Sequence, residues 1–207
     1  MTQAPQATRG WWREYADAEL DPVLRAAINA FNEVGYHGAT VRDIARRAGL
    51  SVAGIYHHHA GKQEMLYSIL QSSMSDLLAR NEAARADGGD DPKARFCNQI
   101  ETLALSHMYW QAQTALGSSE MRALSPQNRA AITGQRAELQ ERIQADVDAA
   151  IADGTFTTPY PKEAVRGVVM MCIATGQWFS WDGPLTPNEV AQRCVTVALD
   201  AMRAVAD

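Results

Sequence analysis

The chain has 207 residues, of which 46% are hydrophobic, and a formal net charge of −5 at pH 7. This length allows one large domain, or a small and a medium domain with a sizeable core. No apolar run approaches the length of a membrane span, so we expect no membrane-spanning helix. The N-terminus lacks a signal-peptide pattern, so we expect no signal peptide. The widely spaced Cys97, Cys172 and Cys194 predict reduced thiols in a cytoplasmic protein.

The charge is unevenly distributed along the chain. Residues 21–62 carry a net +2, whereas residues 63–207 carry −6 and residues 1–20 carry −1. A basic segment joined to a larger acidic one is typical of a protein that contacts DNA with one end. We therefore predict an N-terminal arm over 1–20, a DNA-binding domain over 21–62, and a larger domain over 63–207.

The predicted arm is polar apart from Trp11 and Trp12. One interpretation is an unstructured start, and another is an arm in which Arg9 and Arg13 enter a minor groove. The paired tryptophans favour an arm that docks on something over one that is free. Asp21-Pro22 then predicts a helix start, since Asp caps helices and Pro is favoured in the first turn.

Residues 40–62 have the pattern of two short helices that cross at a tight turn. Thr40 is a natural N-cap, Ala45 is small enough for a close crossing, and Gly49 suits a turn with positive φ. A plain helical hairpin could show the same features. The flanking cations favour instead a helix-turn-helix that places its second helix in the major groove, and they are Arg42, Arg46, Arg47 and Lys62.

The remainder of the chain has helical periodicity throughout. Residues 62–78 predict a long connecting helix, and residues 86–92 have no apolar face and read as a linker. Further helices are predicted over about 92–116, 119–124, 126–152, 162–181 and 187–205, with a break at 157–161. We therefore predict an all-α protein of about nine helices, with an N-terminal three-helix domain followed by a larger helical domain.

Residues 21–70 contain a further set of matching positions: Leu24, Ala27, Ile28, Phe31, Val34-Gly35-Tyr36, Thr40–Ala45, Ala48–Ser51 and Ile55–His58. Together they resemble the DNA-binding domain of TetR-type transcriptional repressors. The chain departs from that family pattern twice. His59 stands where a Phe is usual, and Gly61 stands where Ser, Asn or Asp usually precedes the lysine, so His59 is expected to fill the core less well.

The resemblance implies three kinds of DNA contact. Residues implied to face the bases are Ser51, Ala53 and Gly54, those implied to reach phosphates or base edges are Tyr56, His57 and His58, and those implied to hold the backbone are Thr40 and Lys62. Arg42 of the basic rim joins this set. With so few long polar side chains, recognition is expected to rely on backbone contacts, thymine methyl groups and DNA shape.

The last two predicted helices are apolar around most of their circumference. Such a helix must be covered on both sides. One solution is a four-helix interface with a second copy, which is also how TetR-type repressors dimerise, and the other is a deeply buried pair within a monomer.

The larger domain is rich in methionine and aromatic residues, which form a plain core or adapt to a small molecule. Candidate effector-binding residues are Trp110, Gln113, Thr114, Met121, Arg122, Arg136, Met171, Thr175 and Trp178. Arg122 and Arg136 would suit an anionic group of the effector. The alternative is that both arginines are solvated surface residues. Residues 176–190 also resemble the TetR branch that represses lipid or steroid catabolism and is released by acyl-CoA thioesters.

These patterns indicate a ligand-responsive regulator that binds operator DNA as a homodimer and is released by a small hydrophobic or acyl-CoA-like effector. The alternative is an architectural DNA-binding or dimerisation protein without an effector. We expect no enzyme activity and no cofactor, because no catalytic motif is present. We also expect no metal site, because His57, His58 and His59 would point about 100° apart on a helix.

Overall fold

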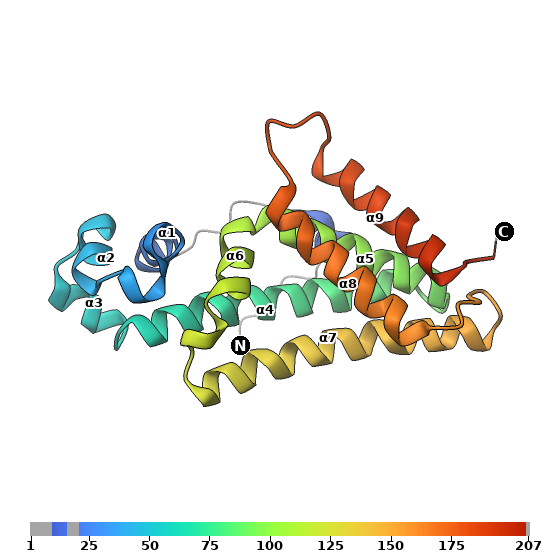
Figure 1. Cartoon of the computed structure of the whole chain (residues 1–207), viewed down its shortest axis with the longest axis horizontal. Helices are drawn as coiled ribbons and strands as arrows, with labels where there is room; N and C mark the ends of the chain where they lie inside the picture. Colours follow the sequence, from blue (N-terminus) through green and yellow to red (C-terminus); the bar gives the residue numbers. More distant parts are fainter. Residues whose placement is uncertain (1–9, 16–20, 206–207) are drawn as a thin grey trace, which may run out of the picture. The chain divides into compact units, whose positions relative to one another are not determined.

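The computed structural model describes residues 10–15 and 21–205 of the chain. This part forms nine α-helices and two short 3-10 helices and contains no β-strand, which confirms the predicted all-α fold (Figure 1). The elements are η1 Trp11–Arg13, α1 Pro22–Gly38, α2 Val41–Ala48, α3 Val52–His58, α4 Lys62–Asp87, α5 Pro92–Tyr109, α6 Gln111–Ser119, η2 Met121–Ala123, α7 Pro126–Ala152, α8 Pro161–Trp178 and α9 Pro187–Met202. Among the described helices, none is long and apolar enough to cross a membrane.

The helices belong to two compact units. Residues 17–76 and 110–138 make one, here called the helix-turn-helix unit, and residues 1–16, 77–109 and 139–207 make the other, here called the large unit. Both α4 and α7 therefore contribute to both units. The functional boundaries at residues 20/21 and 62/63 stay a prediction.

The first helix begins and bends where the sequence indicates. The Asp21 carboxylate accepts from the backbone N–H of Val23 at 2.7 Å, and Pro22 occupies the first helical position. Gly35 interrupts α1 with φ 73°, a backbone conformation that costs glycine least. The last turn of α1 is consequently redirected, and Tyr36 is buried in the core.

The turn between α2 and α3 also follows the sequence prediction. Thr40 Oγ1 accepts from Asp43 N–H at 3.1 Å, and Gly49 has φ 70° at the end of α2. The Leu50 N–H then donates to the Ala45 carbonyl at 3.0 Å and closes the helix end. Ser51 Oγ accepts from Gly54 N–H at 3.0 Å and caps α3.

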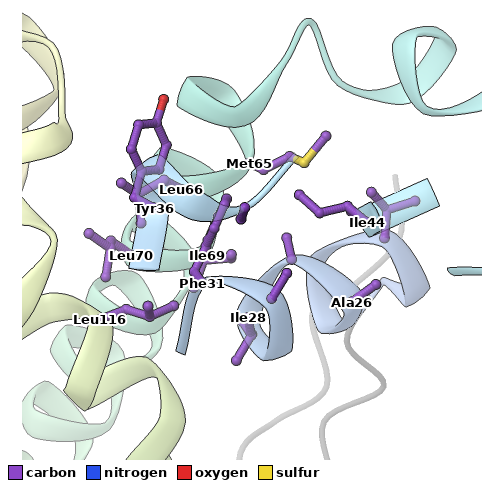
Figure 2. Packing of buried hydrophobic residues seen from close by; sticks show 14 of the residues in the cluster. Ala26, Ile28, Phe31, Tyr36, Ile44, Met65, Leu66, Ile69, Leu70 and Leu116 are labelled. Atoms are coloured by element: carbon purple, nitrogen blue, oxygen red, sulfur yellow. The ribbon is translucent and has the colours of Figure 1, made fainter. Parts of the chain in front are cut away.

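One hydrophobic cluster holds the helix-turn-helix unit together (Figure 2). Phe31 of α1, Ile44 of α2 and Ile55 of α3 pack with Met65 and Leu66 of α4, and all five are almost fully buried. Burial of such side chains stabilises each by roughly 1.5–3 kcal/mol. Because every helix contributes, the orientation of α3 is fixed by the shared core.

Two predicted segments differ from the structure. The helix expected over 92–116 is broken at Trp110, whose φ −114° and ψ 46° separate α5 from α6. The segment expected to be helical over 119–124 contains only the 3-10 helix η2. Apolar periodicity continues through Trp110, so the sequence carries no signal for this change of direction.

The linker expected over 86–92 is instead a tight reversal inside the large unit. Helix α4 continues to Asp87, and Gly89 has φ 62° in the turn to α5. A Cβ on Gly88 would lie 2.6 Å from the Arg95 backbone nitrogen, so this close approach requires glycine. The polar residues that suggested a linker are those that a short helix–helix turn needs.

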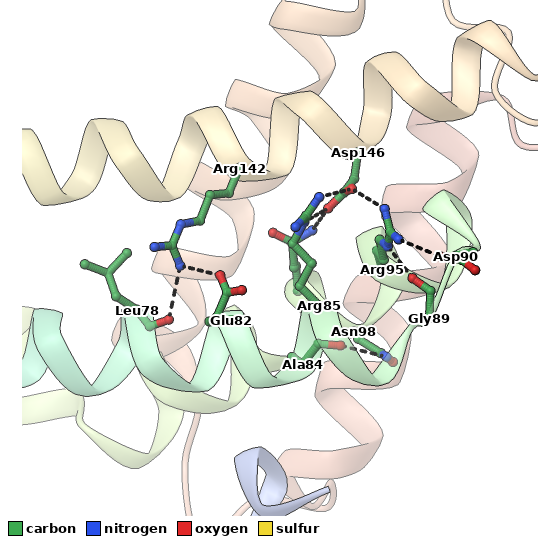
Figure 3. A network of polar contacts seen from close by, with 11 residues as sticks. Leu78, Glu82, Ala84, Arg85, Gly89, Asp90, Arg95, Asn98, Arg142 and Asp146 are labelled. Carbon is green, nitrogen blue, oxygen red and sulfur yellow. Dashed lines mark hydrogen bonds and ion pairs between the residues drawn. The ribbon is translucent and has the colours of Figure 1, made fainter. Parts of the chain in front are cut away.

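A buried carboxylate ties α4, α5 and α7 together in the large unit (Figure 3). Asp146 is almost fully buried and accepts two hydrogen bonds from Arg85, at 2.7 and 3.0 Å, and one from Gln99 at 2.8 Å. The Asp146 carboxylate raises the pKa of Arg85 above its usual value. A buried charge is tolerated only when it is paired and hydrogen-bonded, and Asp146 meets both conditions.

The N-terminal segment 10–15 docks on the large unit, as the paired tryptophans suggested. Trp12 is buried and its Nε1–H donates to Asp87 at 2.8 Å. Arg13 donates to both oxygens of Glu101, at 2.7 and 2.8 Å. The Arg13 guanidinium is thus held by a carboxylate of the large unit, and the minor-groove alternative stays a prediction; Arg9 lies outside the described residues.

His59 should be a destabilising departure from the family pattern, because both ring nitrogens are buried without a hydrogen-bond partner. We predict that His59→Phe raises the free energy of unfolding by about 1–2 kcal/mol, since it replaces these atoms with carbon. Urea denaturation measures this change. His58→Phe is the matched control because His58 is exposed, and an equal effect of both substitutions would contradict the explanation.

Candidate nucleic-acid interface

The exposed side of α3 carries the side chains that the sequence assigned to DNA. Ile55 turns into the core, whereas Tyr56, His57 and His58 are exposed on the helix surface, with Tyr56 55% accessible. Ser51 and Ala53 are exposed as well, and Gly54 is half-buried. The structure thus brings these residues together on one short helix, and their contacts to DNA stay a prediction.

Lys62 has a structural role that the sequence did not reveal. Its Nζ donates to the carbonyl oxygens of Tyr36 and Ala39, both at 2.7 Å, and lies 4.5 Å from the centre of the Tyr36 ring. These carbonyls lie at the end of α1, and the lysine opens α4. The ammonium group therefore connects α1 with α4, and its predicted phosphate contact would have to share this position.

The basic rim of α2 is partly neutralised from within the unit. Asp43 accepts hydrogen bonds from Arg46 and from Arg47, the latter at 2.7 Å, and Arg47 also pairs with Glu33 at 2.7 Å. Bonds from Arg46 and then Arg47 lower the pKa of Asp43 below its usual value. Arg42 is exposed at the start of the same helix. Among the arginines of α2, Arg42 is therefore the one outside this cluster.

A surface pocket of about 570 Å³ lies beside this cluster. Residues of α1 and α2 line it, with Asp21 of the preceding cap, and these are Asp21, Pro22, Arg25, Ala26, Asn29, Arg47 and Ala48. None of the predicted effector residues is among them. The pocket adjoins the ion pairs of α2 through Arg47, which pairs with Asp43 and Glu33.

The predicted effector residues divide between the two units. Six belong to the helix-turn-helix unit, namely Trp110, Gln113, Thr114, Met121, Arg122 and Arg136, and three belong to α8 of the large unit, namely Met171, Thr175 and Trp178. The Arg136 guanidinium donates to the Gly117 carbonyl at 2.9 Å. Their joint role in binding an effector stays a prediction.

The three effector candidates on α8 differ in accessibility. Thr175 is buried and its hydroxyl donates to the carbonyls of Cys172, at 2.7 Å, and Ala104, at 3.3 Å. Trp178 is largely exposed, and Met171 is half-buried. Thr175 therefore supports the packing of α8 on α5 in this structure.

Helices α8 and α9 keep apolar side chains on two sides. Val165 of α8 and Val190 of α9 are buried within the large unit, whereas Met170 is 61% and Val197 is 50% exposed. A helix pair that buries one face and exposes large apolar residues on another is suited to a protein–protein contact. This pattern agrees with a second layer of helices supplied by another copy.

The capped helix pair, its buried crossing and the exposed face of α3 define a helix-turn-helix DNA-binding protein. Two family models extend this result over most of the chain: "Bacterial regulatory proteins, tetR family" matches residues 23–69, and "Tetracyclin repressor-like, C-terminal domain" matches residues 89–202. The chain belongs to the TetR family of transcriptional regulators.

Individual relatives agree with this assignment. The HTH-type transcriptional repressor KstR2 of Mycobacterium tuberculosis is 29% identical over 183 residues, which cover 86% of this chain and 89% of KstR2. Its solved structure, described as a ketosteroid transcriptional regulator, has a TM-score of 0.81 at 24% identity and covers 91% of this chain and 96% of that one. The similarity to KstR2 agrees with the resemblance of residues 176–190 to the branch concerned with steroid catabolism.

A further structure is that of AibR in complex with isovaleryl coenzyme A and operator DNA. It has a TM-score of 0.74 at 23% identity and covers 84% of this chain and 95% of AibR, which shows a shared fold. Since the TetR relatives are transcriptional regulators, the prediction that the chain is not an enzyme is confirmed. In the part of the chain that the structure describes, no group of three or more His, Cys, Asp or Glu side chains is placed to hold a metal.

Asp43 should limit non-specific DNA binding by holding two arginines of the rim. We predict that Asp43→Asn strengthens binding to unrelated DNA and steepens its salt dependence, by about 0.9 in the logarithmic slope for each additional phosphate contact. Fluorescence anisotropy over a range of salt concentrations measures both quantities. Glu33→Gln, which removes only one partner of Arg47, should have a smaller effect, and an unchanged slope in Asp43→Asn would refute this role.

Proposed function

We propose that this protein is a cytoplasmic repressor that binds operator DNA as a homodimer and leaves it when a small molecule binds. The observation that carries the proposal is the exposed face of α3, held on a buried crossing by caps at Thr40 and Ser51. We assign DNA contact to residues 21–62, effector binding and dimerisation to residues 63–207, and an arm to residues 1–20.

The residues proposed to contact DNA have different roles. Ser51, Ala53 and Gly54 allow close approach to base edges, whereas Tyr56 and the adjacent histidines reach phosphates or bases. Thr40, Arg42 and Lys62 hold the DNA backbone. Because Asp43 and Glu33 already pair with two arginines of α2, a single copy has little charge to offer, and two copies on one operator supply the missing affinity.

The proposed effector is hydrophobic and carries an anionic group, as an acyl-CoA thioester does. AibR, which shares the fold, was solved with isovaleryl coenzyme A and operator DNA. In this chain Arg122 is exposed on η2, and the Arg136 guanidinium contacts the α6 backbone. In this proposal the two cations pair with an anionic head group of the effector, and the apolar members of the predicted set contact an acyl chain.

Repression requires the effector to favour a conformation with low operator affinity. A coupling free energy of about 1–3 kcal/mol between the two sites is typical and changes affinity by roughly 5–150-fold. The competing function is a DNA-binding protein without an effector, which would share the helix-turn-helix but respond to no ligand. The structure of AibR with isovaleryl coenzyme A and operator DNA favours the effector-responsive form.

We predict that isovaleryl-CoA, used as the first thioester probe, raises the melting temperature by a few degrees and weakens binding to the DNA upstream of the gene. Differential scanning fluorimetry and fluorescence anisotropy measure the two effects. Free isovalerate and free coenzyme A are the controls. DNA binding that no thioester, acid or neutral aromatic compound alters would support the effector-free alternative instead.

We predict that Met170→Asp combined with Val197→Asp converts the protein to monomers and lowers operator affinity by at least tenfold, because two carboxylates would be buried in the proposed interface. Sedimentation velocity measures the oligomeric state. Val34→Asp is the control, since Val34 is exposed on α1 in the helix-turn-helix unit. A double variant that remains dimeric would show that α8 and α9 do not form the interface.

A further inference from the structure

Two cysteines of the large unit lie on adjacent helices, Cys172 on α8 and Cys194 on α9, and both are free thiols in this structure. Cys172 is fully buried and Cys194 is 6% exposed. The third cysteine, Cys97 on α5, is half-buried. Their wide spacing in the sequence does not reveal that two of the three belong to neighbouring helices.

The ends of α8 and α9 fix how these two helices lie against each other. Just before α8, the backbone N–H groups of Thr157 and Thr158 donate to the Met202 carbonyl at the end of α9, at 3.2 and 3.1 Å. At the other end, the short connection 179–186 joins the end of α8 to the start of α9. Each helix therefore begins near the end of the other, and the pair is antiparallel (Figure 1).

This arrangement brings the two cysteines to the same level. Cys172 lies six residues before the end of α8, and Cys194 lies seven residues after the start of α9. At the rise of an α-helix, these positions are roughly 9 and 10.5 Å from the connection. The Cys172 thiol points inward, where it donates to the Ile100 carbonyl of α5 at 3.9 Å. The thiols of Cys172 and Cys194 also hydrogen-bond to each other, so the two side chains meet across the contact between α8 and α9.

The hydrogen bond between the thiols makes them chemically different. It lowers the pKa of Cys194, and together with burial it raises the pKa of Cys172. Burial raises the pKa of Cys97 to about 11. The thiolate is the reactive form of cysteine, so Cys194 is the favoured nucleophile of the three, and Cys172 is the thiol placed to react with it next.

We propose that Cys172 and Cys194 are a redox modification site, at which hydrogen peroxide produces a reversible disulfide between α8 and α9. The Cys194 thiolate attacks one oxygen of the peroxide, the O–O bond breaks and hydroxide leaves, which gives a sulfenic acid on Cys194. The Cys172 sulfur then attacks the Cys194 sulfur, the S–O bond breaks, and water leaves with the Cys172 proton. The hydroxide takes up the proton that Cys194 released. Two thiols are thus oxidised while one peroxide is reduced to two waters, and a dithiol reductant reverses the bond.

The disulfide would join the two helices to which the proposed function assigns the contact between copies. Met170 lies two residues before Cys172 and Val197 three residues after Cys194, and both are exposed. A covalent link would therefore hold α8 and α9 in one relative position beside this apolar surface. The reaction itself needs neither DNA nor an effector, so the site can fail or stand independently of the repressor proposal.

The test treats the reduced, full-length protein with hydrogen peroxide and removes the peroxide with catalase. The protein is then denatured, alkylated with iodoacetamide and mapped by mass spectrometry. A peptide pair joined through Cys172 and Cys194 should appear, Cys97 should be alkylated, and the oxidised chain should run as a monomer on a non-reducing denaturing gel. Dithiothreitol should remove the link. The control Cys97→Ser should form the link as the wild type does, whereas Cys194→Ser should leave Cys172 open to alkylation.

The melting temperature tests whether the disulfide fits the native packing. The link closes a loop of the chain between two side chains that already touch, so the oxidised protein should melt several degrees above the reduced protein. Cys97→Ser should show the same rise and Cys194→Ser should show none. If Cys194→Ser fails to fold, Cys194→Ala takes its place, and the peptide map of the wild type needs neither variant.

Four outcomes would overturn the proposal. They are oxidation of Cys97 before the pair, alkylation of all three cysteines after peroxide treatment, a disulfide between two copies of the chain, and a lower melting temperature of the cross-linked protein. Each would show that Cys172 and Cys194 serve only as core residues in the contact between α8 and α9.

Discussion

The Lys62 ammonium group donates hydrogen bonds to the carbonyl oxygens of Tyr36 and Ala39, and it thereby connects the first residue of α4 with the end of α1. These two carbonyls lie in and just after the last turn of α1, where carbonyl oxygens have no intrahelical partner. A cation at the C-terminal end of a helix also interacts favourably with the helix dipole. Together with the shared hydrophobic core, this connection holds the end of α1, from which the chain continues through Ala39 into α2 and α3.

The two units use polar residues in opposite ways. In the helix-turn-helix unit, Asp43 and Glu33 form ion pairs with Arg46 and Arg47 at the surface, where the predicted effect is a weaker attraction to arbitrary DNA. In the large unit, Asp146 is buried and almost entirely satisfied, so it fixes α4, α5 and α7 as one layer. Asn81 in the same layer is unsatisfied.

The sequence predicted most of the helix-turn-helix and less of the large unit, for physical reasons. Caps and turns are local, so Thr40 and Gly49 could be assigned from single residues and their neighbours. The break at Trp110 and the short turn after Asp87 depend on which helices pack together, and apolar periodicity does not record that. The partners of Lys62 and Asp146 could not be predicted either, because they lie on segments that are distant in the chain.

Net charge likewise does not record which residues are paired with one another in the folded protein. The excess of +2 over residues 21–62 falls within the segment that matches the N-terminal model of the TetR family, residues 23–69. It did not indicate that Arg46 and Arg47 are bound to carboxylates of the same unit. With those two arginines restrained, one copy offers DNA less charge than its residue count suggests, and the proposed binding in pairs would supply the missing affinity. The apolar faces of α8 and α9 are consistent with that requirement, since a protein whose single DNA contact is weak gains most from a stable dimer.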